Sequence, residues 1–470
     1  MVPITPLDDA PEPCRLSARA LVEAYATRTL SPVEAVDAVL ARIETVDRTC
    51  NGFRFVDAVG ARAQALAAER RYRAGTPLGP LDGVPTSVKD IVNVEGWSTR
   101  HGSLTTADTP ADEDAPAVAH LRAAGAVLLG MTTTPEFGWK AVTDSPLTGI
   151  TRNPWNPERT PGGSSGGAAV AAATGCGPLH IGTDGGGSIR IPCSFTGIVG
   201  IKPTFGRVPA HPLSFFGTVS HLGPMTRSVE DAAAMLAVMS QPDPRDWHQS
   251  WAAAVDAAAL DGDLRGLRIG IWSTPPSGEV AAEVASGFHR ALAVLTDLGA
   301  EVVPVSLPQD GLYEVFRVHW YAGAAQRLRA VDAARRDRID PGFGDIARAG
   351  ARLTLDDFMD ASRARAAFGA AVEGLFAAEI DLMVSPTTAL TAFEAGLELP
   401  AESNLERWIQ WAGFSYPINL TQQPACSVPA GFDGDGLPIG LQLIGPKGAD
   451  EAVLGAALAF ERATRGGLDL

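Results

Sequence analysis

Hydrophobic residues near the N-terminus follow helical spacing. In the segment VEAVDAVLARIETV (33–46), apolar residues recur every three or four positions, which is typical of an amphipathic helix. A helix-start signal precedes it, with Ser31 as N-cap, Pro32 in the first turn and Glu34 placed to close a capping box. The pattern predicts that residues 15–75 are helical.

The pattern changes between residues 80 and 230, where short β-branched runs alternate with turns rich in glycine and other small residues. AVLLG (126–130) predicts a buried strand that follows a helix at about 115–124. GGAAVAAATG (166–175) predicts a small-residue helix able to pack closely against a sheet. Few charges and many residues with special backbone preferences favour a buried site built from loops.

The second half of the chain follows ordinary helix and strand patterns. LRIGIW (267–272) and EVVPVSL (301–307) predict strands on either side of a helix near 279–298, a βαβ unit. The other expected elements are helices at 230–239, 312–377 and the C-terminus, and strands at 380–387 and 436–445. Because no repeat or low-complexity linker divides the chain, the sequence predicts one large α/β domain, 1–470.

Composition and charge narrow the classes of function. Hydrophobic residues make up 46% of the 470 and charged residues 20%, as in a globular protein. The net charge of −16 disfavours binding to nucleic-acid phosphates or anionic membranes. The N-terminus lacks the apolar core of a signal peptide, and no run of about 18 apolar residues predicts a membrane span. We therefore expect a cytoplasmic protein without nucleic-acid or membrane partners.

The cysteines are few, odd in number and widely spaced: Cys14, Cys50, Cys176, Cys193 and Cys426. No Cys-x-x-Cys pair occurs, so neither a zinc site nor a disulfide framework is indicated. Reduced thiols in a cytoplasmic protein are the simplest interpretation.

Two clusters of glycine and serine stand out, TPGGSSGG (160–167) and GTDGGGSIR (182–190). Either cluster alone is compatible with a tight turn, because glycine adopts positive φ readily. The second cluster, however, contains three glycines followed by Ser188. Such a run lets successive backbone N–H groups face one point and bind an oxyanion.

The first cluster matches the Gly-x-Ser-x-Gly pattern of a nucleophile elbow at Ser164. That motif needs a strand before the serine, and the preceding NPWNPERTP is polar and rich in proline. It also needs a catalytic histidine, and none of the later histidines lies in a distinctive setting. The elbow interpretation is therefore disfavoured.

A lysine, Lys89, lies within the apolar stretch TSVKDIVNV. On its own it is compatible with the solvated face of a strand. A buried lysine, however, has a lowered pKa and can act as a base. Such a base is able to activate a serine without a histidine.

Three motifs occur in this order: GVPTSVKD (83–90), TPGGSSGGAAVA (160–171) and GTDGGGSIRIP (182–192). In sequence and spacing they resemble the amidase signature family. Further similar segments are TTPEFG (133–138), TRNPWNP (151–157), GIVGIKPTFGRVP (197–209), GPMTRSVEDAA (223–233), SVPAGF (427–432) and GLPIGLQLIG (436–445). The family-like core thus covers about 75–235 and 376–465, and the resemblance is weakest across about 240–375.

The resemblance implies an amidase signature fold, in which helices cover both faces of a mixed central β-sheet. It also implies that Ser188 is the nucleophile, that Ser164, held by a cis peptide, relays protons, and that Lys89 is the base. No metal or organic cofactor is expected. The oxyanion would be held by backbone N–H groups of Gly185, Gly186, Gly187 and Ser188. For Asp184 and Arg190, an ion pair that shapes the glycine loop is favoured over substrate contact.

Family resemblance places Met131, Phe137 and Trp139 near the acyl pocket, and residues 312–328 and 401–416 around its entrance. Their aromatic side chains favour an apolar, aryl-bearing substrate, although ordinary core packing explains them equally well.

The expected function is hydrolysis of carbon–nitrogen bonds in small amides, including anilides and carbamates or urethanes, by a free-standing enzyme. The alternative is an amidotransferase-type subunit that needs partner proteins. Gln423 precedes Pro424 where amidotransferase subunits usually have glycine, which argues against that alternative. A monomer or homodimer is the family-level expectation.

Overall fold

A mixed sheet of eleven strands forms the centre of the computed structural model, which describes residues 6–249, 254–258 and 260–464. The first five and last six residues of the predicted domain 1–470 lie outside the described residues. In spatial order the strands are β1 (Phe53–Val56), β3 (Val127–Thr132), β2 (Pro85–Lys89), β6 (Leu179–Asp184), β8 (His221–Thr226), β7 (Val199–Lys202), β12 (Ala425–Phe432), β13 (Pro438–Ile444), β11 (Leu382–Pro386), β9 (Arg268–Ile271) and β10 (Glu301–Pro304).

The sheet is mixed, as expected. β2 pairs in parallel with β3 and β6, and β9 pairs in parallel with β10 and β11. The other pairs are antiparallel. The predicted βαβ unit is present as β9, α9 (Ala282–Asp297) and β10, and it extends the same sheet rather than forming a separate one.

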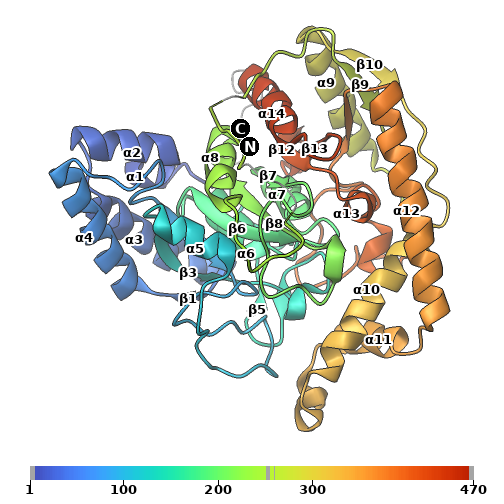
Figure 1. Ribbon diagram of the computed structural model, residues 1–470, viewed down its shortest axis with the longest axis horizontal. Helices are drawn as coiled ribbons and strands as arrows, with labels where there is room; N and C mark the ends of the chain where they lie inside the picture. The colour runs from blue at the N-terminus through green and yellow to red at the C-terminus, as the bar shows by residue number, and fades with distance from the viewer. Residues whose placement is uncertain (1–5, 250–253, 259, 465–470) are drawn as a thin grey trace.

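Helices lie around the sheet (Figure 1). The N-terminal group is α1 (Glu12–Arg15), α2 (Ala18–Thr27), α3 (Pro32–Cys50) and α4 (Ala58–Ala74), drawn in blue. On the opposite side, in yellow and orange, lie α10 (Leu312–Arg329), α11 (Pro341–Gly350) and α12 (Leu355–Ala378). The remaining α-helices are α5 (Pro116–Ala123), α6 (Gly166–Ala173), α7 (Arg190–Thr196), α8 (Val229–Met239), α13 (Tyr416–Thr421) and α14 (Asp450–Thr464).

The predicted capping box begins α3. The N–H of Glu34 donates to Ser31 Oγ at 3.1 Å, and the N–H of Ser31 donates to Glu34 Oε2 at 2.8 Å. The expectation that 15–75 is wholly helical is wrong, because β1 interrupts it. Phe53 is buried and pairs with Thr132 at the edge of the sheet, so tertiary pairing outweighs the local helical pattern.

The small-residue helix α6 is completely buried, as its sequence predicts. A Cβ at Gly167 would lie 2.4 Å from the carbonyl oxygen of Gly52 and from the backbone nitrogen of Thr133. Only glycine permits this approach, which brings the first turn of α6 against the residues that flank β1 and β3. In the described part of the chain, no helix combines the length and apolar character needed to cross a membrane.

Candidate active site

Lys89 is the last residue of β2, and its side chain is fully buried. Its Nζ lies 2.7 Å from Ser164 Oγ and 2.9 Å from both Ser165 Oγ and Thr183 Oγ1. None of the described carboxylates forms an ion pair with it. Burial holds the pKa of Lys89 well below its ordinary value, and the negative charge of Asp184 opposes this only in part. The site therefore favours a neutral amine, which is a base.

Ser165 and Thr183 hold this amine in place. Ser165 Oγ donates to the Thr183 carbonyl at 3.1 Å and accepts from the Thr183 N–H at 3.2 Å. A neutral amine has two N–H donors and one lone pair. With Ser165 and Thr183 as acceptors for the two donors, the lone pair is left to face the hydroxyl of Ser164.

Ser164 and Ser188 come from the two glycine–serine clusters and line the same cavity. The Gly163–Ser164 peptide bond is cis, as the resemblance implied. The Ser165 N–H donates to the carbonyl oxygen of Ser188 at 3.2 Å, which ties the two clusters together. Residues 151–163, which lead into Ser164, form no strand, so the nucleophile-elbow geometry is absent at this serine.

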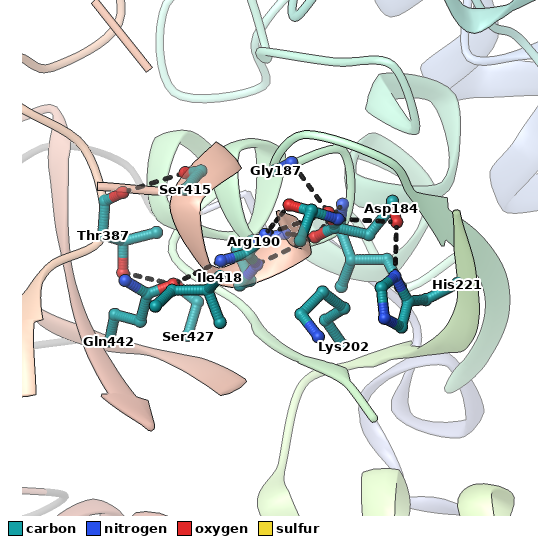
Figure 2. A network of polar contacts seen from close by, with 12 residues as sticks. Asp184, Gly187, Arg190, Lys202, His221, Thr387, Ser415, Ile418, Ser427 and Gln442 are labelled. Atoms are coloured by element: carbon teal, nitrogen blue, oxygen red, sulfur yellow. Dashed lines mark hydrogen bonds and ion pairs between the residues drawn. The ribbon is translucent and has the colours of Figure 1, made fainter. Parts of the chain in front are cut away.

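The glycine loop after β6 is shaped by an ion pair between Asp184 and Arg190 (Figure 2). Arg190 Nε lies 2.9 Å from Asp184 Oδ2, and its Nη2 lies 3.0 Å from Oδ1. Both side chains are fully buried. Burial alone would raise the pKa of Asp184, but the charge and hydrogen bonds of Arg190 outweigh this effect and hold the pKa below its ordinary value. The interpretation of this pair as a structural ion pair is consistent with the geometry.

Two amides from the C-terminal part of the chain complete this network. Arg190 Nη1 donates to Gln442 Oε1 and its Nη2 donates to Asn419 Oδ1, both at 2.6 Å. Asn419 Nδ2 donates in turn to the carbonyl oxygen of Asp184 at 2.9 Å. Each nitrogen of the guanidinium therefore has an acceptor, as a buried arginine requires.

One of the four amides predicted to hold an oxyanion has another role. The N–H of Gly187 donates to Asp184 Oδ1 at 2.7 Å, so it is occupied within the loop. By contrast, no hydrogen bond from the N–H of Gly185, Gly186 or Ser188 is found within the described part of the chain. These three N–H groups are free to donate to an oxyanion.

The cavity beside these residues has a volume of about 690 Å³. Its walls include five aromatic side chains: Phe137, Phe205, Phe215, Phe216 and Trp320. Trp320 stacks on Phe216 with ring centroids 3.5 Å apart and planes 2° from parallel. It also packs close to the glycine loop, since a Cβ at Gly185 would lie 2.9 Å from its ring. A chamber with several flat aromatic walls is thus also lined by Ser188.

Comparison with known proteins identifies the family of the chain. The amidase family model matches residues 34–454. An acylamidase of Rhodococcus erythropolis is 37% identical over 95% of both chains, and a glutamyl-tRNA(Gln) amidotransferase subunit of Roseiflexus castenholzii is 37% identical over 94% of both. A solved bacterial aryl acylamidase superposes with a TM-score of 0.89 at 32% identity over 96% of both chains. The chain belongs to the amidase signature family. Enzymes of this family hydrolyse amides.

The structure of this amidase places two predicted substrate residues outside the cavity. Phe137 lines it, but Met131 and Trp139 do not. Met131 lies on β3, where its sulfur is 2.8 Å from Arg54 Nη2, because the strand directs its side chain toward that residue. Trp139 lies behind the wall, where its carbonyl oxygen accepts a hydrogen bond from Trp320 Nε1 at 3.0 Å.

Of the two segments expected at the entrance of the amidase cavity, one contributes to its walls. The segment 312–328 supplies Trp320, Gln326 and Arg327. The segment 401–416 supplies no wall residue, and its Trp408 packs behind Trp320 with ring centroids 5.6 Å apart.

Sequence reasoning did not assign Thr183, Asn419 or Gln442 to the site. A signal existed for Thr183, which directly precedes Asp184 within the second glycine–serine motif. Asn419 and Gln442 carry no such signal, because a polar residue in an apolar segment does not reveal which distant charge it contacts.

Proposed function

We propose that this protein is a free-standing amidase that cleaves small amides with an apolar, aryl-bearing portion, through an acyl-enzyme on Ser188. One observation carries the proposal: the buried amine of Lys89 contacts Ser164 at the wall of the cavity that Ser188 also lines. We propose further that it acts in the cytoplasm as a monomer or homodimer.

The proposed reaction begins with proton transfer. Neutral Lys89 takes the proton of Ser164, and Ser164 takes the proton of Ser188 as the Ser188 oxygen attacks the substrate carbonyl. The proton then returns through Ser164 to the leaving nitrogen, the carbon–nitrogen bond breaks, and the amine departs. Water attacks the acyl-enzyme by the same route and releases the acid.

The charge that develops on the substrate oxygen needs donors that are already in place. The N–H groups of Gly185, Gly186 and Ser188 are the proposed donors, since each is free of an internal acceptor in the described part of the chain. Donors of this kind contribute about 3–4 kcal/mol each to transition-state stabilisation. Gly187 is omitted from this set because its N–H is bonded to Asp184.

The aromatic walls support an aryl-bearing substrate. Flat rings pack efficiently between aromatic side chains, and burial of each square ångström of apolar surface contributes about 25 cal/mol. Carbamates and urethanes share the planar carbonyl–nitrogen group of amides, so we include them among the proposed substrates.

An amidotransferase-type subunit is the second candidate, favoured by the 37% identity to the Roseiflexus amidotransferase protein. Against it stands Gln423, whose buried amide donates to Glu373 Oε1 at 3.0 Å. Its backbone carbonyl also accepts a hydrogen bond from Lys202. A glutamine that fills this position departs from the glycine usual in such subunits.

An activity assay of the purified protein, without partner proteins, distinguishes the free-standing amidase from the amidotransferase-type subunit. A chromogenic anilide, a primary amide and an aryl carbamate are compared by kcat/KM, with Ser188→Ala as the inactive variant and Ser194→Ala as a matched buried-serine control. Hydrolysis that is lost in Ser188→Ala and kept in Ser194→Ala supports the proposal. Absence of hydrolysis of every probe by the wild-type protein contradicts it and favours the partner-dependent subunit.

A further inference from the structure

Arg327 projects into the cavity from the helix that also supplies Trp320. The two residues are seven positions apart, so they share a face of α10 and are separated by about 10 Å along its axis. Trp320 packs near Gly185, beside the proposed nucleophile. On the helix, Arg327 is therefore displaced by about two turns from the residue that packs beside the glycine loop.

The guanidinium of Arg327 has no partner of opposite charge. In residues 6–249, 254–258 and 260–464 it forms neither an ion pair nor a hydrogen bond, and its Nε is buried without an acceptor. The guanidinium lies over the ring of Phe137, whose centroid is 4.4 Å from the guanidinium carbon. A buried donor without an acceptor is costly, and a ligand oxygen would satisfy it.

Glu136 is not the missing hydrogen-bond acceptor of Arg327. Its charge favours the protonated form of Arg327, but its carboxylate accepts hydrogen bonds from Ser103 Oγ and from the N–H of Asp340. Burial raises the pKa of Glu136 to about 6. Its two oxygens thus accept hydrogen bonds from other donors, and the charge of Arg327 is left for the cavity.

The surroundings of Arg327 are otherwise neutral. Among the described residues that line the cavity, Arg327 is the only one with a lysine or arginine side chain. Burial lowers the pKa of the neighbouring His101 to about 3, so this histidine is neutral, and its Nδ1 is buried without a partner. The one acidic wall residue in the described ranges, Asp246, accepts hydrogen bonds from the N–H groups of Ala210 and His248.

We propose that Arg327 binds a carboxylate of the substrate, and that this enzyme prefers amides with a carboxylate at the end remote from the scissile bond. The inference rests on the proposed function. The apolar portion of such a substrate would lie along Trp320 and Phe137, with its carboxylate facing the guanidinium. Arginine and carboxylate match as a two-pronged, charge-assisted pair, which is strong where water is partly excluded.

Pairs of probes that differ only in this charge test the proposal. The mono-4-nitroanilides of glutaric, adipic and suberic acid place the carboxylate on the acyl side, and acetanilides of 4-aminobenzoic and 4-aminophenylacetic acid place it on the amine side. Each acid is compared with its methyl ester. We expect the wild-type protein to favour at least one acid over its ester by about ten- to a hundredfold in kcat/KM, mainly through a lower KM.

The variants Arg327→Gln and Arg327→Lys locate the effect. Arg327→Gln should remove the preference for the acid. Arg327→Lys should keep part of it, because lysine retains the positive charge but cannot donate two parallel hydrogen bonds to a carboxylate. Arg329→Gln, on the exposed side of the same helix, should keep the whole preference. Equal rates for every acid and ester, or a preference that survives in Arg327→Gln, would overturn the proposal.

Binding separates this inference from the proposed function. Calorimetric titration of the same pairs into Ser188→Ala measures affinity without turnover. The carboxylate site is supported if Ser188→Ala binds an acid more tightly than its ester and if this difference disappears in the double variant Ser188→Ala/Arg327→Gln. This holds even if the wild-type protein hydrolyses none of the probes. Equal affinities for acid and ester refute it, even if the protein is an active amidase.

Discussion

Lys89 Nζ lies 2.7 Å from Ser164 Oγ at the end of a fully buried strand. This contact pairs a lysine whose pKa is lowered by burial with a hydroxyl at the wall of the cavity. The same amine is held by two further hydroxyls, so its position does not depend on the substrate.

Replacement of Lys89 by methionine should abolish hydrolysis while the fold is retained. Methionine has a similar length but no basic atom, and loss of a positioned general base lowers kcat by about a hundred- to ten-thousandfold. Steady-state kinetics with an activated anilide measures the loss, and circular dichroism checks the fold. A folded Lys89→Met protein with near wild-type kcat contradicts the assignment of Lys89 as base.

Activity should rise with pH as Lys89 loses its proton. Since burial lowers its pKa well below 10.5, the neutral base is present at a pH where an exposed lysine is charged. The rate should rise through this lowered pKa and then level off. With chemistry shown to be rate-limiting, a profile that is flat from about pH 6 to 9 argues against a lysine base.

Thr183→Val should move that profile to lower pH. Thr183 Oγ1 accepts a hydrogen bond from the amine at 2.9 Å and so stabilises the ammonium form. Without this acceptor the charged form is less favourable, and the pKa of Lys89 falls further. The midpoint of kcat/KM against pH is the measurement, and a shift toward higher pH would contradict the role given to Thr183.

Gly186→Ala should impair both stability and turnover. Its Cβ would lie 2.8 Å from Phe316 Cζ and Trp408 Cη2, so the aromatic wall or the glycine loop must move. Overpacking of this kind costs about 1–3 kcal/mol in the free energy of unfolding. Gly369→Ala in α12 is the control, because nothing lies within 4 Å of its added Cβ. Urea unfolding and kcat should distinguish the two variants.

Asp184→Asn should destabilise the protein strongly. It leaves the buried guanidinium of Arg190 without its counter-charge, and breaking a buried pair in this way costs about 3–5 kcal/mol. Because the folded pKa of Asp184 lies below its unfolded value, the stability it contributes is present above the unfolded pKa. That contribution is lost as the pH falls through the folded pKa. Thermal unfolding of both proteins at neutral and acidic pH tests this: their melting temperatures should converge in acid.

Much of this arrangement was predictable from the sequence. The helix pattern around Val39 and Ile43, the capping box at Ser31 and the strand of β3 follow from local spacing, and they are present. The three motifs also bring Ser164 and Ser188 to one cavity, with Lys89 in contact with Ser164. Local patterns and motif spacing predict the features that depend on residues close together in the sequence.

The remainder depends on contacts between distant segments. Phe53 belongs to a strand only because Thr132 pairs with it. Trp139 lies behind the cavity wall because Trp320, from α10, occupies the position in front of it. The N–H of Gly187 turns inward because Arg190 holds Asp184 beneath it. None of these relationships has a periodicity that a single sequence reveals.

The partners of Arg190 also have a consequence for biosynthesis. Asn419 and Gln442 follow it by 229 and 252 residues, and both belong to elements near the C-terminus. A ribosome releases the motif residues long before it releases the strand that braces their loop. A nascent chain therefore lacks this support until β13 has been made, and a fragment that stops before β13 carries Ser164 and Ser188 without the amides that hold Arg190.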